Sequence, residues 1–143
     1  MIQAVIDVNV LVSALVGPVG FSRRVITAWQ ENQLGVITAE GILNELDEKL
    51  RLPRISKRLP DPDTNRQWIY QLLRTQAYLI GISPHECVVV TGDPEDDYVL
   101  AAVRLGRADY LVTGDHGLLA LREYAGAKIV GPREFVTILE SRQ

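Results

Sequence analysis

Residues 93–115 decide the fold of this chain, beginning as Asp93-Pro94-Glu95-Asp96-Asp97 and ending as Thr113-Gly114-Asp115. Between these ends lie an alanine-rich apolar segment with the composition of a helix and then a short apolar run that is typical of a buried strand. Helices that alternate with buried strands are the units of a layered α/β domain. In such a domain, the acidic start of the helix and the acidic end of the strand lie at the same edge of the sheet.

Capping explains three of the four acids that open this stretch. Asp93 is a good N-cap, and Glu95 and Asp96 suit the positive end of the helix dipole. Asp97 lies a turn inside the helix, where the dipole favours an acid much less. Asp97 and Asp115 therefore suggest a cation site, and other acids of the chain are expected to face it.

Composition predicts one soluble domain over residues 1–143. A hydrophobic content of 47% supplies a core, and the single Cys87 excludes an internal disulfide. The net charge of −3 gives no overall attraction to nucleic acid or acidic membranes, so a polyanion would need a local basic patch. Residues 2–6 already have the pattern of a strand, with no signal peptide or membrane-spanning run, which predicts a cytoplasmic protein without a membrane partner.

Strands alternate with helices along the chain. Five strands are predicted, at residues 2–6, 35–37, 87–90, 110–113 and 127–130. Helices are predicted at residues 8–15, 23–32, 38–50, 65–80, 93–105, 118–124 and 132–141. This order predicts an α/β fold, a three-layer α/β/α sandwich with a doubly wound, mostly parallel five-stranded sheet.

Four acids fall in four different strand–helix units. Asp7 ends the first predicted strand, and Asp115 lies just past the fourth. Glu45 lies on the helix after the second strand, and Asp97 lies near the start of the helix after the third. All four side chains can therefore reach one crevice at the carboxyl edge of the sheet. Taken singly, Asp7 is equally well explained as a helix cap, and Glu45 is better explained as a surface ion pair with Lys49.

Four carboxylates in one crevice need a positive charge beside them. Without a cation, their repulsion would be costly or would raise the pKa of at least one until it holds a proton. The two histidines, His85 and His116, are too few and too scattered for a zinc site. Oxygen ligands alone favour Mg²⁺ or Mn²⁺.

Four motifs around these acids follow one another along the chain. They are Asp7-Val8-Asn9-Val10-Leu11-Val12-Ser13-Ala14-Leu15, Ile42-Leu43-Asn44-Glu45-Leu46, Asp93-Pro94-Glu95-Asp96-Asp97 and Tyr110-Leu111-Val112-Thr113-Gly114-Asp115. Together they resemble the PIN-domain proteins, and in particular the subgroup described as toxin components of toxin–antitoxin systems. The resemblance covers nearly the whole chain. It departs at Val8, where the family commonly has a threonine whose hydroxyl could bond a neighbouring carboxylate.

The resemblance implies a metal-dependent endoribonuclease that hydrolyses phosphodiester bonds of single-stranded RNA. Carried over by motif, the catalytic and metal-binding quartet is Asp7, Glu45, Asp97 and Asp115, with Asn9 and Thr113 as polar supports. One or two Mg²⁺ or Mn²⁺ ions would activate a water for in-line attack. The family also implies a homodimer and, for a toxin, an antitoxin protein as partner.

A basic run follows the Glu45 helix and holds a third of the 15 basic residues of the chain. It consists of Lys49, Arg51, Arg54, Lys57 and Arg58, with no acid between them. Such a run is commonly a solvated surface, but it is also the densest candidate for binding RNA phosphates. The predicted RNA-binding residues are Arg51, Arg54 and Arg58.

Two other functions remain open from the residues. The haloacid-dehalogenase-type phosphatases have a late Gly-Asp-x-x-x-Asp motif, which residues 92–97 match. Their first motif fails here, because Asn9 stands where a general acid is needed and an amide cannot deliver a proton. A PIN-like module that binds RNA or protein without catalysis is the second alternative, and the presence of all four acids argues against it.

Overall fold

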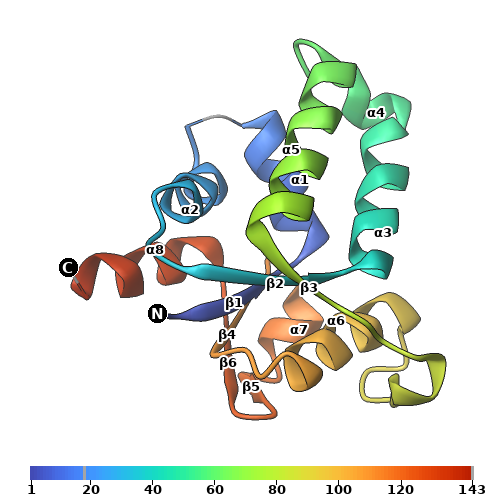
Figure 1. Ribbon diagram of the computed structural model, residues 1–143, viewed down its shortest axis with the longest axis vertical. Coiled ribbons are helices and arrows are strands. Elements are labelled where there is room, and N and C mark those ends of the chain that lie inside the picture. The colour runs from blue at the N-terminus through green and yellow to red at the C-terminus, as the bar shows by residue number, and fades with distance from the viewer. Residues whose placement is uncertain (18, 143) are drawn as a thin grey trace.

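The computed structural model describes residues 1–17 and 19–142 as a sheet covered by helices on both faces (Figure 1). The strands are β1 (Gln3–Ile6), β2 (Gly35–Ala39), β3 (Ala77–Ile80), β4 (Tyr110–Val112), β5 (Glu123–Tyr124) and β6 (Ala127–Val130). The helices are α1 (Val8–Val16), α2 (Phe21–Gln30), α3 (Glu40–Arg51), α4 (Pro53–Ser56), α5 (Pro62–Gln76), α6 (Pro94–Leu105), α7 (His116–Leu119) and α8 (Pro132–Ser141). A short 3-10 helix covers Pro84–Glu86.

The sheet of the described residues has six strands in the order β3-β2-β1-β4-β6-β5. Every neighbouring pair in it runs parallel except β5 and β6, which are antiparallel. From β1 the chain moves outward to β2 and β3, and it then returns to the other side of β1 for β4 and β6. This reversal creates a switch point between β1 and β4, where open α/β sheets form ligand-binding crevices at the carboxyl ends of the strands.

Helices cover the sheet in two layers. Figure 1 shows α1, α3, α4 and α5 over one face and α6 and α7 over the other. The predicted α/β sandwich with a mostly parallel sheet is confirmed. Within the described residues, no single helix is long and apolar enough to cross a membrane, and α1 and α2 meet that length and composition only as a sharply bent pair.

The prediction of a third strand at residues 87–90 is wrong. That segment has no regular structure, and its three valines are exposed. The backbone N–H of Val90 donates instead to the Asp97 carboxylate, at 3.2 Å. The third strand is β3, which occupies the end of the predicted helix at residues 65–80 and pairs with β2.

The predicted count of five strands is also wrong. The sixth strand, β5, lies where a helix was expected at residues 118–124. Helix α7 ends at Leu119, and the chain then turns back at Ala125 and Gly126, both with positive φ. The resulting hairpin of β5 and β6 closes one edge of the sheet.

Helix α6 begins as the sequence predicts. The side chain of Asp93 accepts hydrogen bonds from the backbone N–H groups of Glu95 and Asp96, at 2.9 and 3.4 Å. The helix is tied to the start of α3, because the backbone N–H of Gly41 donates to the Tyr98 hydroxyl at 3.0 Å. A Cβ at position 41 would lie only 2.5 Å from the Tyr98 ring. Glycine therefore allows α3 and α6, which both carry predicted site residues, to approach each other closely.

Candidate active site

Asp7 and Asp115 are joined by the hydroxyl of Thr113 at the switch point. Asp7 directly follows β1 and is 5% exposed, and Thr113 is fully buried after β4. Thr113 Oγ1 donates to Asp7 Oδ2 at 2.7 Å and accepts from the backbone N–H of Asp115 at 3.0 Å. Burial raises the pKa of Asp7 above its ordinary value, while the hydrogen bond from Thr113 opposes that rise.

Asp115 has a second structural contact as the N-cap of α7. Its Oδ2 accepts from the backbone N–H of Leu118 at 2.9 Å. The charge of Asp115 contributes to the raised pKa of Asp7, although less than burial does. The sequence attributed a raised pKa to repulsion between acids, so it predicts the direction of this shift but not its main cause.

Asp97 is turned toward the segment that precedes α6. Its Oδ1 accepts from the backbone N–H groups of Val90 and Thr91 and from the Thr91 hydroxyl, at 3.2, 2.8 and 2.9 Å. The side chain is buried, with 6% exposure. These hydrogen bonds, first among them that from the Thr91 backbone, hold the pKa of Asp97 below its ordinary value. The carboxylate thus fixes the entry to α6, and its predicted role as a metal ligand stays a prediction.

Asp96 is the α6 acid that lies in the field of Asp115 and Asp7. Burial first, and then the negative charges of Asp115, Asp93 and Asp7, raise the pKa of Asp96 to about 6. From the sequence, Asp96 is explained only by the positive end of the helix dipole. Successive residues point about 100° apart around a helix, so Asp96 lies in different surroundings from its neighbour Asp97, which is bound by Thr91.

Glu45 forms the ion pair with Lys49 that the sequence offered as the simpler interpretation, but this pair is not an open surface contact. Lys49 Nζ lies 3.0 Å from Glu45 Oε1, and the Glu45 side chain is only 14% exposed. The same Nζ donates to Oδ1 of Asn9 on α1, at 3.1 Å. Its charge also lowers the pKa of Asp7. Glu45, Asn9 and Asp7 are thereby linked through Lys49.

Glu45 is the acid best suited to exchange a proton at neutral pH. Burial raises its pKa to about 7, a hydrogen bond with Glu95 adds to the rise, and Lys49 opposes it. A carboxyl with this pKa is divided between its acid and base forms at pH 7, which is the property of a general acid or base.

Stability of the metal-free protein is expected to depend on pH through Glu45. The pKa of Glu45 is about 7 in the folded protein, above the ordinary value of 4.5, so its contribution to stability is complete below pH 4.5 and is lost as pH rises through 7. Glutamine at this position cannot ionise. As pH rises from 4.5 to 8, the free energy of unfolding of Glu45→Gln should therefore increase relative to that of the unmodified protein, by up to about 3 kcal/mol. Urea unfolding in EDTA at several pH values measures this difference. Parallel pH curves for the two proteins would show that Glu45 titrates normally.

The acids fit a divalent cation in chemistry but not in their present spacing. Within residues 1–17 and 19–142, no group of three or more His, Cys, Asp or Glu side chains is arranged to hold a metal ion. The carboxylates of Asp7, Asp96 and Asp115 are nevertheless hard oxygen donors that act on one another electrostatically. Metal binding would therefore require these side chains to rotate. To serve as a further ligand, Glu45 would also have to break its ion pair with Lys49.

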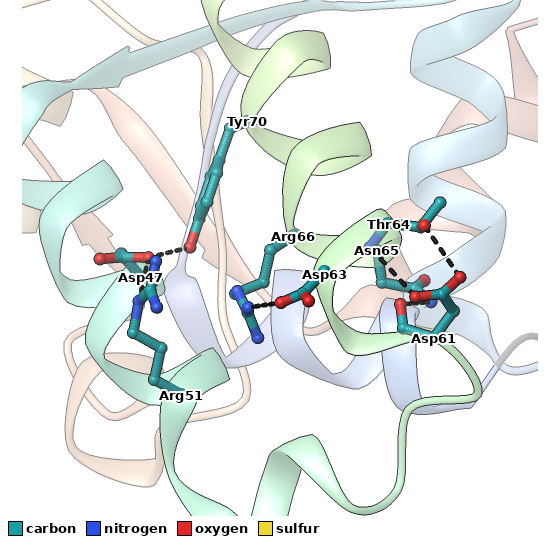
Figure 2. Close-up of polar contacts among 8 residues, drawn as sticks. All are labelled: Asp47, Arg51, Asp61, Asp63, Thr64, Asn65, Arg66 and Tyr70. Carbon is teal, nitrogen blue, oxygen red and sulfur yellow. Dashed lines mark hydrogen bonds and ion pairs between the residues drawn. The ribbon is translucent and has the colours of Figure 1, made fainter.

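The basic run lies beyond the end of α3, and its three arginines differ in their contacts. Arg51 and Tyr70 reach the same carboxylate, that of Asp47, from α3 and α5 (Figure 2). Arg54 is exposed on α4. Arg58 borders a shallow cleft of about 270 Å³ that Asn9 also lines. We call the set of acids Asp7, Glu45, Asp96, Asp97 and Asp115 the acidic site. Among the three arginines, Arg58 is thus the one that shares a cleft with Asn9, which Lys49 links to this site.

Comparisons with known proteins agree with this architecture. The family model described as PIN domain matches residues 3–117. The uncharacterized protein MJ1680 of Methanocaldococcus jannaschii is 27% identical over 148 residues, which cover 97% of this chain and 92% of that protein. Among solved structures, VapBC2 from Rickettsia felis bound to a DNA fragment from their promoter gives a TM-score of 0.59 at 12% identity, covering 91% of this chain and 98% of that chain. FitAcB from Neisseria gonorrhoeae gives 0.51 at 12% identity with the same coverage.

Proposed function

Because this chain belongs to the PIN-domain family, we propose that it is a metal-dependent endoribonuclease that hydrolyses single-stranded RNA. The observation that supports the proposal is that acids from three separate strand–helix units act on one another at the switch point. Asp7 and Asp115 share the Thr113 hydroxyl, and Asp96 lies in the field of both. The repulsion between these carboxylates opposes folding, and a bound cation would relieve it.

The proposed chemistry divides the acids by role. Asp7, Asp115 and an acid of α6 would hold Mg²⁺ or Mn²⁺, which supplies an activated water and positive charge for the developing oxyanions. Asp96 is our first choice on α6, and Asp97 is the alternative from the motif. Glu45, with its pKa of about 7, would orient the attacking water or take its proton. The products would carry 5′-phosphate and 3′-hydroxyl ends.

The proposal also covers the domain organisation, location and protein partners of the chain. The 143 residues would form one PIN-like domain that acts in the cytoplasm as a homodimer. An antitoxin protein would be its partner if the chain is the toxin of a toxin–antitoxin pair. VapBC2, which shares the fold, was solved with DNA from their promoter. Co-expression with the protein encoded beside this chain, followed by size-exclusion chromatography, would test that partnership.

Cleavage of single-stranded RNA with and without Mn²⁺ tests the function directly. The purified protein is expected to cut single-stranded RNA only when Mn²⁺ or Mg²⁺ is present, and to leave p-nitrophenyl phosphate intact. Cleavage of the phosphomonoester but not of RNA would instead favour the phosphatase. RNA binding without any cleavage would favour the inactive module. Cleavage that persists in EDTA would contradict the metal dependence.

The basic run is expected to bind the RNA backbone. Replacing Arg51, Arg54 and Arg58 together with Ala should weaken binding similarly for all sequences, since phosphate contacts do not read bases. The slope of log affinity against log salt should become less steep by about 2, at roughly 0.7 per lost contact to a single strand. Fluorescence anisotropy at several salt concentrations measures both effects.

A matched variant separates local contacts from net charge. The triple replacement of Lys128, Arg133 and Arg142 with Ala removes the same three charges, all from exposed side chains outside the run. It should leave the salt slope nearly unchanged. Equal effects of the two triple variants would mean that the run is a solvated surface.

A further inference from the structure

Lys49 carries the positive charge nearest to Glu45, and it is held in place from two helices. Its Nζ is 3.0 Å from Glu45 Oε1 one turn earlier on α3 and 3.1 Å from Asn9 Oδ1 on α1. The Lys49 side chain is 30% exposed, so much of it is withdrawn from water. Its charge reaches Asp7, two residues before Asn9. These contacts differ from those of a freely moving surface lysine.

The other cation at this end of α3 serves a different acid. Arg51 Nε lies 2.9 Å from Asp47 Oδ1, on the side of α3 that faces Tyr70 of α5 (Figure 2). Lys49 is therefore the residue of the basic run that is paired inside the acidic site. In the absence of a metal, a positive charge there offsets the repulsion between Glu45 and the neighbouring carboxylates.

The same pairing works against a divalent ion. A carboxylate oxygen that accepts from an ammonium group is less available as a metal ligand, and a positive charge a few ångströms away repels a second cation. This agrees with the arrangement of the described acids, in which no three are gathered to hold a metal. Glu45 would have to exchange Lys49 for the ion.

We propose that Lys49 is the resident cation of the acidic site and that it competes with a divalent ion for the Glu45 carboxylate. This inference rests on the proposed function, because it assumes that the acids bind a metal. Lys49 then sets the ion concentration above which the site fills. Once released from Glu45, its ammonium group lies beside the metal site, where the phosphates of RNA would pass.

Manganese titration of the metal-free protein by calorimetry tests the competition. Lys49→Met is expected to bind Mn²⁺ on the order of tenfold more tightly than the unmodified protein, because a unit positive charge beside the ion is removed. Lys49→Arg keeps the charge and should stay near the unmodified affinity. Lys128→Met is the matched control. Lys128 is exposed on β6 and is in register with Tyr110 at the start of β4, whereas the site lies at the carboxyl ends of the strands.

A second measurement uses the unmodified protein and does not depend on the folding of a variant. The ammonium signal of Lys49 in ¹H–¹⁵N spectra should shift as Mg²⁺ is added, while that of Lys128 should not. An Lys49 signal that stays constant while Mg²⁺ binds would overturn the proposal.

The outcomes separate this inference from the proposed function. If the unmodified protein binds Mn²⁺ and Lys49→Met binds it equally well, the competition is absent and the metal-dependent nuclease stands. If only Lys49→Met binds Mn²⁺, the competition is established and the metal dependence of the unmodified protein fails. If neither binds, both proposals fail.

Discussion

Asp96→Asn is expected to lower the rate of RNA cleavage by at least roughly a hundredfold while the protein stays folded. The loss should exceed the cost of removing an outer partner of a metal ligand, which is about 10–100-fold. The fold should tolerate this change, because Asp96 is half-buried and its raised pKa means that ionisation is already unfavourable there. A gel assay of cleavage together with thermal unfolding measures both properties.

Asp97→Asn is expected to affect stability more than the rate of RNA cleavage. Three hydrogen bonds converge on Asp97 Oδ1, and hydrogen bonds to an ionised acceptor are stronger than those to a neutral one. The variant should lose stability and retain more activity than Asp96→Asn. Asp93→Asn is the matched control, since asparagine caps a helix about as well as aspartate. Full loss of cleavage in a stable Asp97→Asn protein, with an active Asp96→Asn, would return the metal site to the assignment made from the motif.

Thr113→Val is expected to cause the largest loss of stability among changes of similar size at the site. The variant keeps the shape of the side chain but leaves buried Asp7 without its donor at 2.7 Å and the Asp115 N–H without its acceptor. Each unsatisfied group costs about 1–3 kcal/mol. Urea unfolding in EDTA measures this cost. Thr113→Ser keeps the hydroxyl and should therefore retain most of the stability that Thr113→Val loses.

The cost of Thr113→Val should also depend on pH. The hydrogen bond from Thr113 lowers the pKa of Asp7, so it favours the ionised carboxylate. Its contribution is therefore present when Asp7 is ionised in the folded protein and is lost as pH falls through the folded pKa. The variant should differ most from the unmodified protein at pH 8 and least near pH 4. An equal difference at both pH values would indicate that the hydroxyl acts only through Asp115.

The sequence predicts most of the sheet because buried parallel strands carry a strong local signal. The strands at Gln3–Ile6 and Ala127–Val130 are β-branched or apolar except at Gln3 and Lys128, and they are found where expected. Residues 87–90 have the same composition, but their hydrogen bonds go to an acid of the next helix instead of to a strand. The edge strand Ala77–Ile80 continues the apolar spacing of α5. Hydrophobic periodicity alone therefore does not show where the helix ends and the strand begins.

The choice between Asp96 and Asp97 shows the limit of sequence for the site. A change of one residue in helix phase turns a side chain through about 100°, which is finer than a boundary predicted from pattern. The contact that distinguishes the two side chains is the hydrogen bond from the Thr91 backbone N–H to Asp97, and it depends on the path of an irregular segment. The pairing of Glu45 with Lys49 is visible in the sequence, whereas its burial and the bridge to Asn9 come only from the packing of α1 on α3.

The hydrogen bond between Asp7 and Thr113 joins residues 106 positions apart. Contacts of such long sequence separation form late, because a long loop must close first. During synthesis at about 5–20 residues per second, a nascent chain would therefore carry Asp7 for several seconds before Thr113 and Asp115 existed to complete the site. If the proposed RNA cleavage needs the complete site, a growing chain would leave the RNA around its own ribosome intact until β4 had emerged and paired with β1.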